Sequence, residues 1–105
     1  ARIERHDPAL HAFVAVTAER ALADARAAEA RIMRGEARGP LDGIPFGHKD
    51  IVNTAGIETT GCSAILRGNV PGRDAHVARR LAEAGTVMLG KLTTHEFALG
   101  GPSFD

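Results

Sequence analysis

The spacing of hydrophobic and polar positions changes several times along the 105-residue chain, and each change predicts a structural element. "HAFVAV" at residues 11 to 16 alternates loosely and is rich in Phe and Val, which is typical of a short strand. Apolar residues then recur at helical spacing over about residues 17 to 34. Arg20, Asp24 and Arg31 lie off the apolar face of this helix. The face itself consists of Ala18, Ala21, Leu22, Ala25, Ala28 and Ile32.

The second half of the chain predicts strands, loops and one further helix. Pro and Gly residues after position 38 exclude a helix, so "IPFGHKDIV" is expected to be a strand bounded by turns. A polar, glycine-punctuated loop with one short helical turn near "SAIL" follows. The remaining expectations are a helix in "AHVARRLAEA", a strand in "TVMLG" and a helical turn in "THEFALGG".

Capping residues support both predicted helices. Thr17 and Asp74 stand at the two N-cap positions, where their side-chain oxygens can accept a backbone N–H. Gly35 and Gly85 follow the two helices as stop signals. A helix, a tight turn and a strand in immediate succession favour an α/β layer.

Composition narrows the classes of protein to which the chain can belong. Thirteen Lys and Arg balance 13 Asp and Glu, so no basic field for nucleic acid or anionic lipid is expected. No apolar run approaches the roughly 20 residues that span a bilayer. The single Cys62 can form no internal disulfide, which favours a reducing, cytoplasmic compartment. Nineteen alanines and the lack of Trp and Tyr predict a thin core for the one domain the length allows.

Two patterns suggest other functions and are set aside. "GTVMLGK" at 85 to 91 has the spacing of a phosphate-binding loop, but Leu92 replaces the required Ser or Thr and a strand lies between the glycines. The five histidines, Cys62 and the carboxylates show no zinc-site spacing, so no metal and no cofactor are expected.

Lys49 raises the main chemical question, because it stands at the end of an apparently buried strand. Alternation places Lys49 on one face and the neighbouring Asp50 on the other. A lysine facing an apolar interior without a carboxylate loses solvation, and its lowered pKa would suit a general base. The other interpretation is a strand-end lysine whose stem extends to water. The residues themselves leave both open.

Three segments in order resemble the opening part of the amidase signature family. They are "DPALHAFVAV", "GPLDGIPFGHKDIVNTAGIETTGCSAIL" and "DAHVARRLAEAGTVMLGKLTTHEFALG", and the resemblance runs from about residue 7 to the end. Family members usually carry a hydrophobic residue before the Lys-Asp pair, whereas Gly47 and His48 stand here. The resemblance implies an α/β fold, with residues 1–105 as the N-terminal part of the amidase signature domain, a mixed β-sheet covered by helices.

The resemblance also implies a serine hydrolase with a Ser-cis-Ser-Lys triad, in which the lysine corresponds to Lys49. The two serines of the triad belong to a Gly/Ser-rich segment that this chain does not contain. Ser63 and Ser103 lie outside any such context, and Ser63 is expected to tie down its loop. Ala98 and Gly100 match positions that line the acyl pocket, although an ordinary loop would explain them equally.

Three functions therefore compete. The first is an amidase acting on a small-molecule amide, of which this chain is a fragment that needs the remainder of the amidase chain and is inactive alone. The second is the glutaminase subunit of a tRNA-dependent amidotransferase. The third is a non-catalytic α/β interaction module. "TTHEF" and "GGPSFD" depart from the amidotransferase pattern and favour a general amidase. Homodimer formation stays open.

Overall fold

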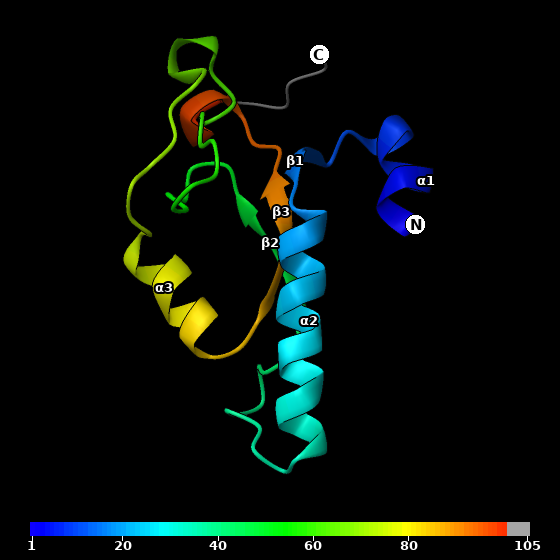
Figure 1. Ribbon diagram of the computed structural model, residues 1–105. Helices are drawn as coiled ribbons and strands as arrows, with labels where there is room; N and C mark the ends of the chain where they lie inside the picture. Colours follow the sequence, from blue (N-terminus) through cyan, green and yellow to red (C-terminus); the bar gives the residue numbers. More distant parts are fainter. Residues whose placement is uncertain (101–105) are drawn as a thin grey trace.

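The computed structural model describes residues 1–100 and shows a three-stranded mixed sheet with helices, as the α/β prediction requires (Figure 1). The helices are α1 (Arg2–Leu10), α2 (Ala18–Met33) and α3 (His76–Glu83), and the short 3-10 helices are η1 (Ala64–Leu66) and η2 (Glu96–Ala98). The strands are β1 (Phe13–Val16), β2 (Pro45–Lys49) and β3 (Val87–Leu92). Among the described residues, no helix is long and apolar enough to cross a membrane.

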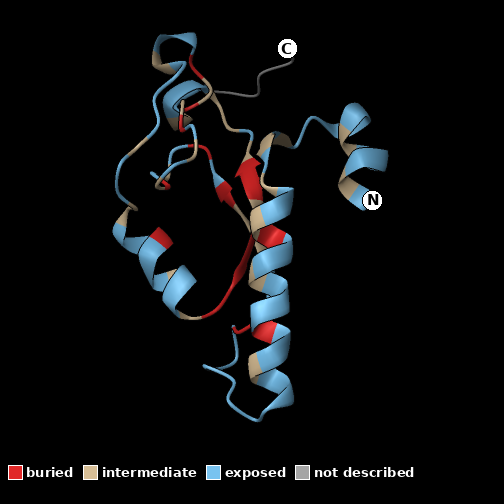
Figure 2. Ribbon diagram, viewed as in Figure 1, coloured by how far each residue is buried: buried red, intermediate tan, exposed pale blue. Residues whose placement is uncertain are grey.

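The strand β3 lies at the centre of the sheet, antiparallel to β1 and parallel to β2. Residues from α2, α3, β2 and β3 together line one polar cavity, so both helices cover the same face of the sheet. The buried apolar core is small and lies between them and β3 (Figure 2). It consists of Ala21, Ala28, Ala78, Val87 and Met88.

The helix α2 lies within one residue of the predicted bounds, and its predicted inward face is confirmed in part, because Ala21 and Ala28 are buried. Leu22 and Ile32 are exposed, whereas Arg20, Asp24 and Arg31 line the cavity between α2 and α3. The helical periodicity of the sequence predicted that these three charged side chains lie off the inward face of α2. They can face inward because each has a partner: Arg20 pairs with Asp24 at 3.6 Å, and Arg31 pairs with Asp42 from the following loop.

The predicted helix caps differ from the structure in two places. Thr17 occupies the N-cap position of α2, but its hydroxyl donates to the Met88 carbonyl of β3 at 3.1 Å instead of capping the helix. Asp74 is not the N-cap of α3; its carboxylate accepts the Ala55 N–H at 2.7 Å and thereby holds the long loop. Both side chains satisfy a tertiary partner in place of a local one.

The helix α1 has no counterpart among the elements predicted from the sequence. It contains no buried residue, and the Asp7 carboxylate joins it to β1 by accepting the N–H groups of Ala12 and Phe13 at 2.8 and 3.2 Å.

The strand predicted for residues 44–52 ends early at Lys49, because the Val52 N–H bonds the Lys49 carbonyl at 3.0 Å and turns the chain.

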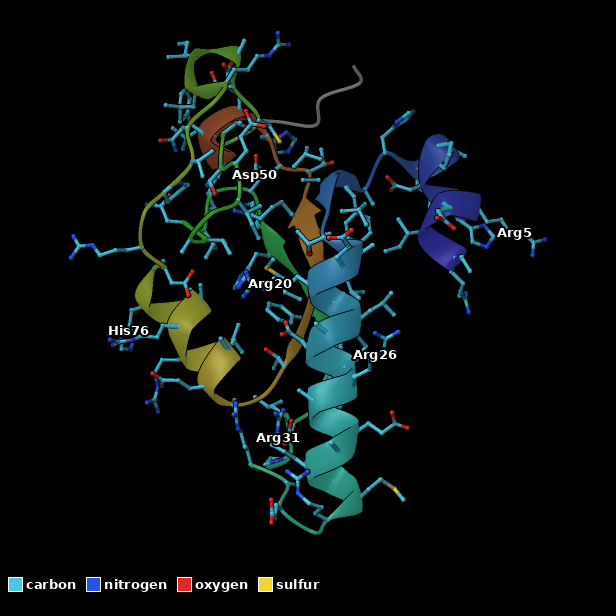
Figure 3. The ribbon with its side chains drawn as sticks, viewed as in Figure 1. Arg5, Arg20, Arg26, Arg31, Asp50 and His76 are labelled. Atoms are coloured by element: carbon cyan, nitrogen blue, oxygen red, sulfur yellow. The ribbon has the colours of Figure 1, made fainter. Side chains whose placement is uncertain are left out.

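The pair between Arg31 and Asp42 connects the C-terminal half of α2 to the loop before β2 (Figure 3). Arg31 donates to both carboxylate oxygens at 2.6 and 3.0 Å, and the Arg38 N–H adds a bond at 2.9 Å. The hydrogen bonds from Arg31 lower the pKa of Asp42 to about 2. The charged form is therefore the one that the fold stabilises.

This lowered pKa predicts how the stability of the protein depends on pH. Asp42 stabilises the fold fully above its unfolded pKa of about 3.9, and this contribution is lost as the pH falls towards about 2. Asp42→Asn should lower the melting temperature above pH 4 and converge with the wild type towards pH 2. Thermal unfolding from pH 7 to pH 2 measures the difference. Glu36→Gln, which removes an exposed carboxylate 3.0 Å from Arg34, should leave the profile unchanged; an equal effect of both variants would contradict the prediction.

Gly90 permits the close contact between β1 and β3. A Cβ at this position would overlap the Ala15 carbonyl oxygen and lie 3.1 Å from the Val16 Cα, and both atoms belong to the backbone of the neighbouring strand. Gly90→Ala should therefore force the strands apart and lower the free energy of unfolding by about 1–3 kcal/mol.

Gly72→Ala is the matched control for Gly90→Ala, because nothing lies within 4 Å of a Cβ built there. It should change the free energy of unfolding by less than about 0.5 kcal/mol. Denaturant unfolding of the two variants measures both values. A Gly90→Ala protein as stable as Gly72→Ala would show that the sheet accommodates the methyl group.

Candidate active site

The two lysines of the chain lie at one edge of the sheet. Because β2 runs parallel to β3, the two strands end together, and Lys49 pairs with Leu92 while His48 pairs with Lys91. The carboxyl ends of neighbouring parallel strands are a common place for binding residues in α/β proteins. The sequence patterns singled out Lys49 and presented Lys91 only as the end of an apparent phosphate-binding motif.

Lys49 is exposed in the part of the chain that the structure describes. It lines an open depression of about 350 Å³ with Thr93, Thr94 and His95. No hydrogen bond or ion pair engages its amine within residues 1–100. The desolvated, apolar surroundings expected of a lysine base are therefore not formed by these residues.

Asp50, labelled in Figure 3, is almost completely buried, whereas the neighbouring Lys49 is exposed, which agrees with the opposite faces that strand alternation predicts. Its Oδ2 accepts the Thr60 hydroxyl at 2.7 Å and the Thr60 N–H at 3.2 Å. Its backbone N–H donates to Leu92 and its carbonyl accepts from Gly61. Asp50 therefore fixes the loop after β2 against the end of β3.

Lys91 is the buried lysine of the site, with no exposed surface. Its Nζ donates to the Val52 carbonyl at 2.6 Å and to the Thr59 hydroxyl at 2.7 Å, and it lies 3.6 Å from the Asp50 Oδ1. Burial lowers the pKa of the Lys91 amine, and the negative charge of Asp50 opposes that shift. The signal in the sequence that could have found it is the position of Lys91 directly after the β-prone run "TVMLG".

His48 occupies the helix-covered face of β2. It is buried, packs edge-on against Phe46 with 4.6 Å between ring centroids, and lines the cavity of about 270 Å³ between α2 and α3. Burial lowers the pKa of His48, and the charge of Lys91 acts in the same direction. Gly47, on the other face, leaves room for Leu92, whose side chain would lie 2.8 Å from a Cβ there.

The loop after β2 carries Ser63, which is held by hydrogen bonds. Its Oγ donates to the Glu96 carboxylate at 2.7 Å and accepts the Ile65 N–H at 3.4 Å, which begins η1. The expectation that Ser63 ties down its loop is confirmed. Ser103 lies outside the described residues.

Ser63, Cys62, Thr94 and Glu96 line a second depression of about 670 Å³ beside the sheet. The Cys62 Sγ accepts the Thr94 N–H at 3.3 Å, so the loop after β2 is joined to the segment after β3. Thr94 also lines the depression that holds Lys49. The two depressions therefore adjoin at Thr94.

Ala98 and Gly100 lie at and beyond the end of η2, outside both depressions as the described residues form them. The backbone there is unusual, with φ of 49° at Phe97, 60° at Ala98 and 124° at Gly100. The φ at Gly100 is one that L side chains rarely adopt, which agrees with glycine there, whereas Phe97 shows that a large side chain can take the conformation found at Ala98. The structure does not bring either residue to Lys49.

Known proteins are similar to this chain in sequence and in fold. A glutamyl-tRNA(Gln) amidotransferase subunit from Anaeromyxobacter sp. (strain K) is 54% identical over 100 residues, which cover 95% of this chain and 20% of that protein. The native peptide amidase of Stenotrophomonas maltophilia superposes with a TM-score of 0.79 at 38% identity, over 90% of this chain and 19% of that one. A bacterial aryl acylamidase of the amidase signature family superposes with a TM-score of 0.79 at 29% identity, over 90% and 20%.

The matches agree on the family and on how much of each relative's length this chain covers. The chain spans about a fifth of the length of the curated relatives it matches. The amidase family model matches residues 1–103. This chain therefore belongs to the amidase family, whose fold supplies the sheet edge on which its two lysines lie.

Proposed function

We propose that the protein containing this chain hydrolyses a carboxamide C–N bond and that Lys49 is its general base. The amidase family match over residues 1–103 carries the proposal. In the triad that the family resemblance implies, a neutral lysine takes a proton through a bridging serine from a nucleophilic serine. The nucleophile attacks the amide carbon, the amine or ammonia leaves with a proton, and water hydrolyses the acyl-enzyme. The two serines would come from residues outside this chain.

The two lysines differ in a way that supports Lys49. Lys91 has no exposed surface, and its amine is committed to Val52, Thr59 and Asp50. It cannot reach a substrate without breaking those contacts. The amine of Lys49 is exposed at the same sheet edge. As the proposed base, Lys49 would be in contact with residues from outside 1–100, among them the bridging serine that passes it the proton.

We assign Ala98 and Gly100 to the wall of the acyl pocket. Their small size leaves space, and the φ of 124° at Gly100 favours glycine at that position. The substrate expected there is a small-molecule amide.

Substitution of Lys49 tests the base assignment in the full-length protein. Lys49→Ala and Lys49→Arg should both lower kcat by about 10²- to 10⁴-fold, because neither side chain can accept a proton near neutral pH. Initial rates of ammonia or amine release measure the effect. Arg26→Ala, on the outward face of α2, is the control and should retain kcat (Figure 3). Near-normal turnover by Lys49→Arg would remove the base role.

A second candidate function has specific support from the curated relatives. Proteins 52–54% identical to this chain are named as subunits of glutamyl-tRNA(Gln) amidotransferases. Such a protein would release ammonia from glutamine for use by its partner subunits. The segments "TTHEF" and "GGPSFD" support the general amidase instead.

Substrate preference separates the two candidates. The full-length protein, purified alone, should release ammonia from simple carboxamides such as acetamide or benzamide at least as fast as from glutamine. Coupled measurement of ammonia compares the substrates. Turnover restricted to glutamine and dependent on added partner proteins would favour the amidotransferase.

A further inference from the structure

Lys91 is buried directly behind the turn that carries Lys49. The loop after β2 covers its amine, and no part of the side chain reaches solvent in the described structure. A buried ammonium is costly unless it is paired and hydrogen-bonded, so its partners must be held in place. Lys91 therefore stabilises a specific backbone arrangement in that loop.

Val52 connects the two lysines. Its N–H donates to the Lys49 carbonyl at 3.0 Å, and its own carbonyl accepts from the Lys91 Nζ at 2.6 Å. The amine of Lys91 thus holds the far end of the four-residue turn that begins at Lys49. Movement of Val52 would break one bond to each lysine.

Thr59 and Asp50 are the other two partners of the Lys91 amine. The Thr59 hydroxyl accepts from Lys91 at 2.7 Å and is oriented by donating to the Ile57 carbonyl at 3.2 Å. The Asp50 Oδ1 is buried, has no hydrogen-bond partner among the described residues, and lies 3.6 Å from the Lys91 Nζ. Removing the ammonium would leave this carboxylate oxygen without its counter-ion, and the Val52 carbonyl would keep only the Thr54 hydroxyl, 3.1 Å away, as a side-chain donor.

We propose that Lys91 is a positioning residue that fixes the turn at residues 49–52 and thereby the direction of the Lys49 side chain. This inference rests on the proposed function, because it takes Lys49 as the base. A base misplaced by about 1 Å loses much of its effect, since proton transfer requires hydrogen-bond distance. Lys91 acts through Val52 and does not touch the substrate.

Three variants of the full-length enzyme test the proposal. Lys91→Met removes the amine and keeps an unbranched side chain, Thr59→Val removes one hydroxyl, and Thr59→Ser restores it. We expect kcat to fall at least tenfold in Lys91→Met and several-fold in Thr59→Val, with KM within twofold of the wild type and kcat near normal in Thr59→Ser. Hydrogen exchange of a peptide containing residues 49–52 should accelerate in the first two variants.

Arg31→Met is the matched control, because it removes the cationic partner of the other buried aspartate, Asp42, at a different part of the fold. It should lower the melting temperature while kcat and exchange at residues 49–52 stay at wild-type values. A loss of kcat in Arg31→Met equal to that in Lys91→Met would reduce Lys91 to a general stabilising role and overturn the proposal.

Further outcomes separate this proposal from the proposed function. If folded Lys91→Met keeps the wild-type kcat, the positioning role alone is overturned. Wild-type hydrogen exchange at residues 49–52 in that variant has the same consequence. Near-normal turnover in Lys49→Arg overturns the base assignment. If Lys91→Met does not fold, Thr59→Val decides: wild-type kcat in that variant overturns the positioning role, and a loss rescued by Thr59→Ser supports it.

Discussion

The parallel pairing of β2 with the central strand β3 governs most of this architecture. It brings the ends of two strands that are far apart in the sequence to one edge, with Lys49 opposite Leu92 and Lys91 opposite His48. The same central strand accepts β1 on its other side, where Gly90 allows the backbones to approach. The three-stranded sheet therefore determines where the helices, the loops and both lysines lie.

Two buried carboxylates stabilise the fold in addition to its small apolar core. Asp42 binds Arg31 and holds the loop before β2 to α2, while Asp50 faces Lys91 and holds the loop after β2 to β3. Each carboxylate also accepts a backbone N–H group, from the loop that it fastens. Buried charges need such sets of partners, and the resulting bonds specify where each loop lies. Strand β2 is therefore positioned by ion pairs at both of its ends.

The two lysines at this end of the sheet illustrate two roles of lysine, one as a buried structural charge and one as an accessible base. Lys91 is enclosed, hydrogen-bonded and shifted in pKa by burial, which are properties of a structural charge as much as of a catalytic one. Lys49 is accessible beside Thr93 and Thr94, where further residues of an amidase could contact it. A perturbed pKa alone would have selected Lys91 for the proposed reaction, although access to substrate is the first requirement of a base.

Local patterns in the sequence were enough to locate α2, α3 and the three strands, and the Lys-Asp pair with its surrounding segments identified the amidase resemblance. Alternation also predicted that Lys49 and Asp50 face opposite ways, because that property is local to one strand. Which charges are buried could not be predicted in this way. Periodicity placed Arg31 on the outer face of α2, but it turns inward because Asp42 arrives from a separate loop. Lys91 is enclosed because the loop after β2 folds over its amine. Both outcomes depend on partners distant in the sequence, and those partners, more than the local pattern, set the free energy of burying a charge.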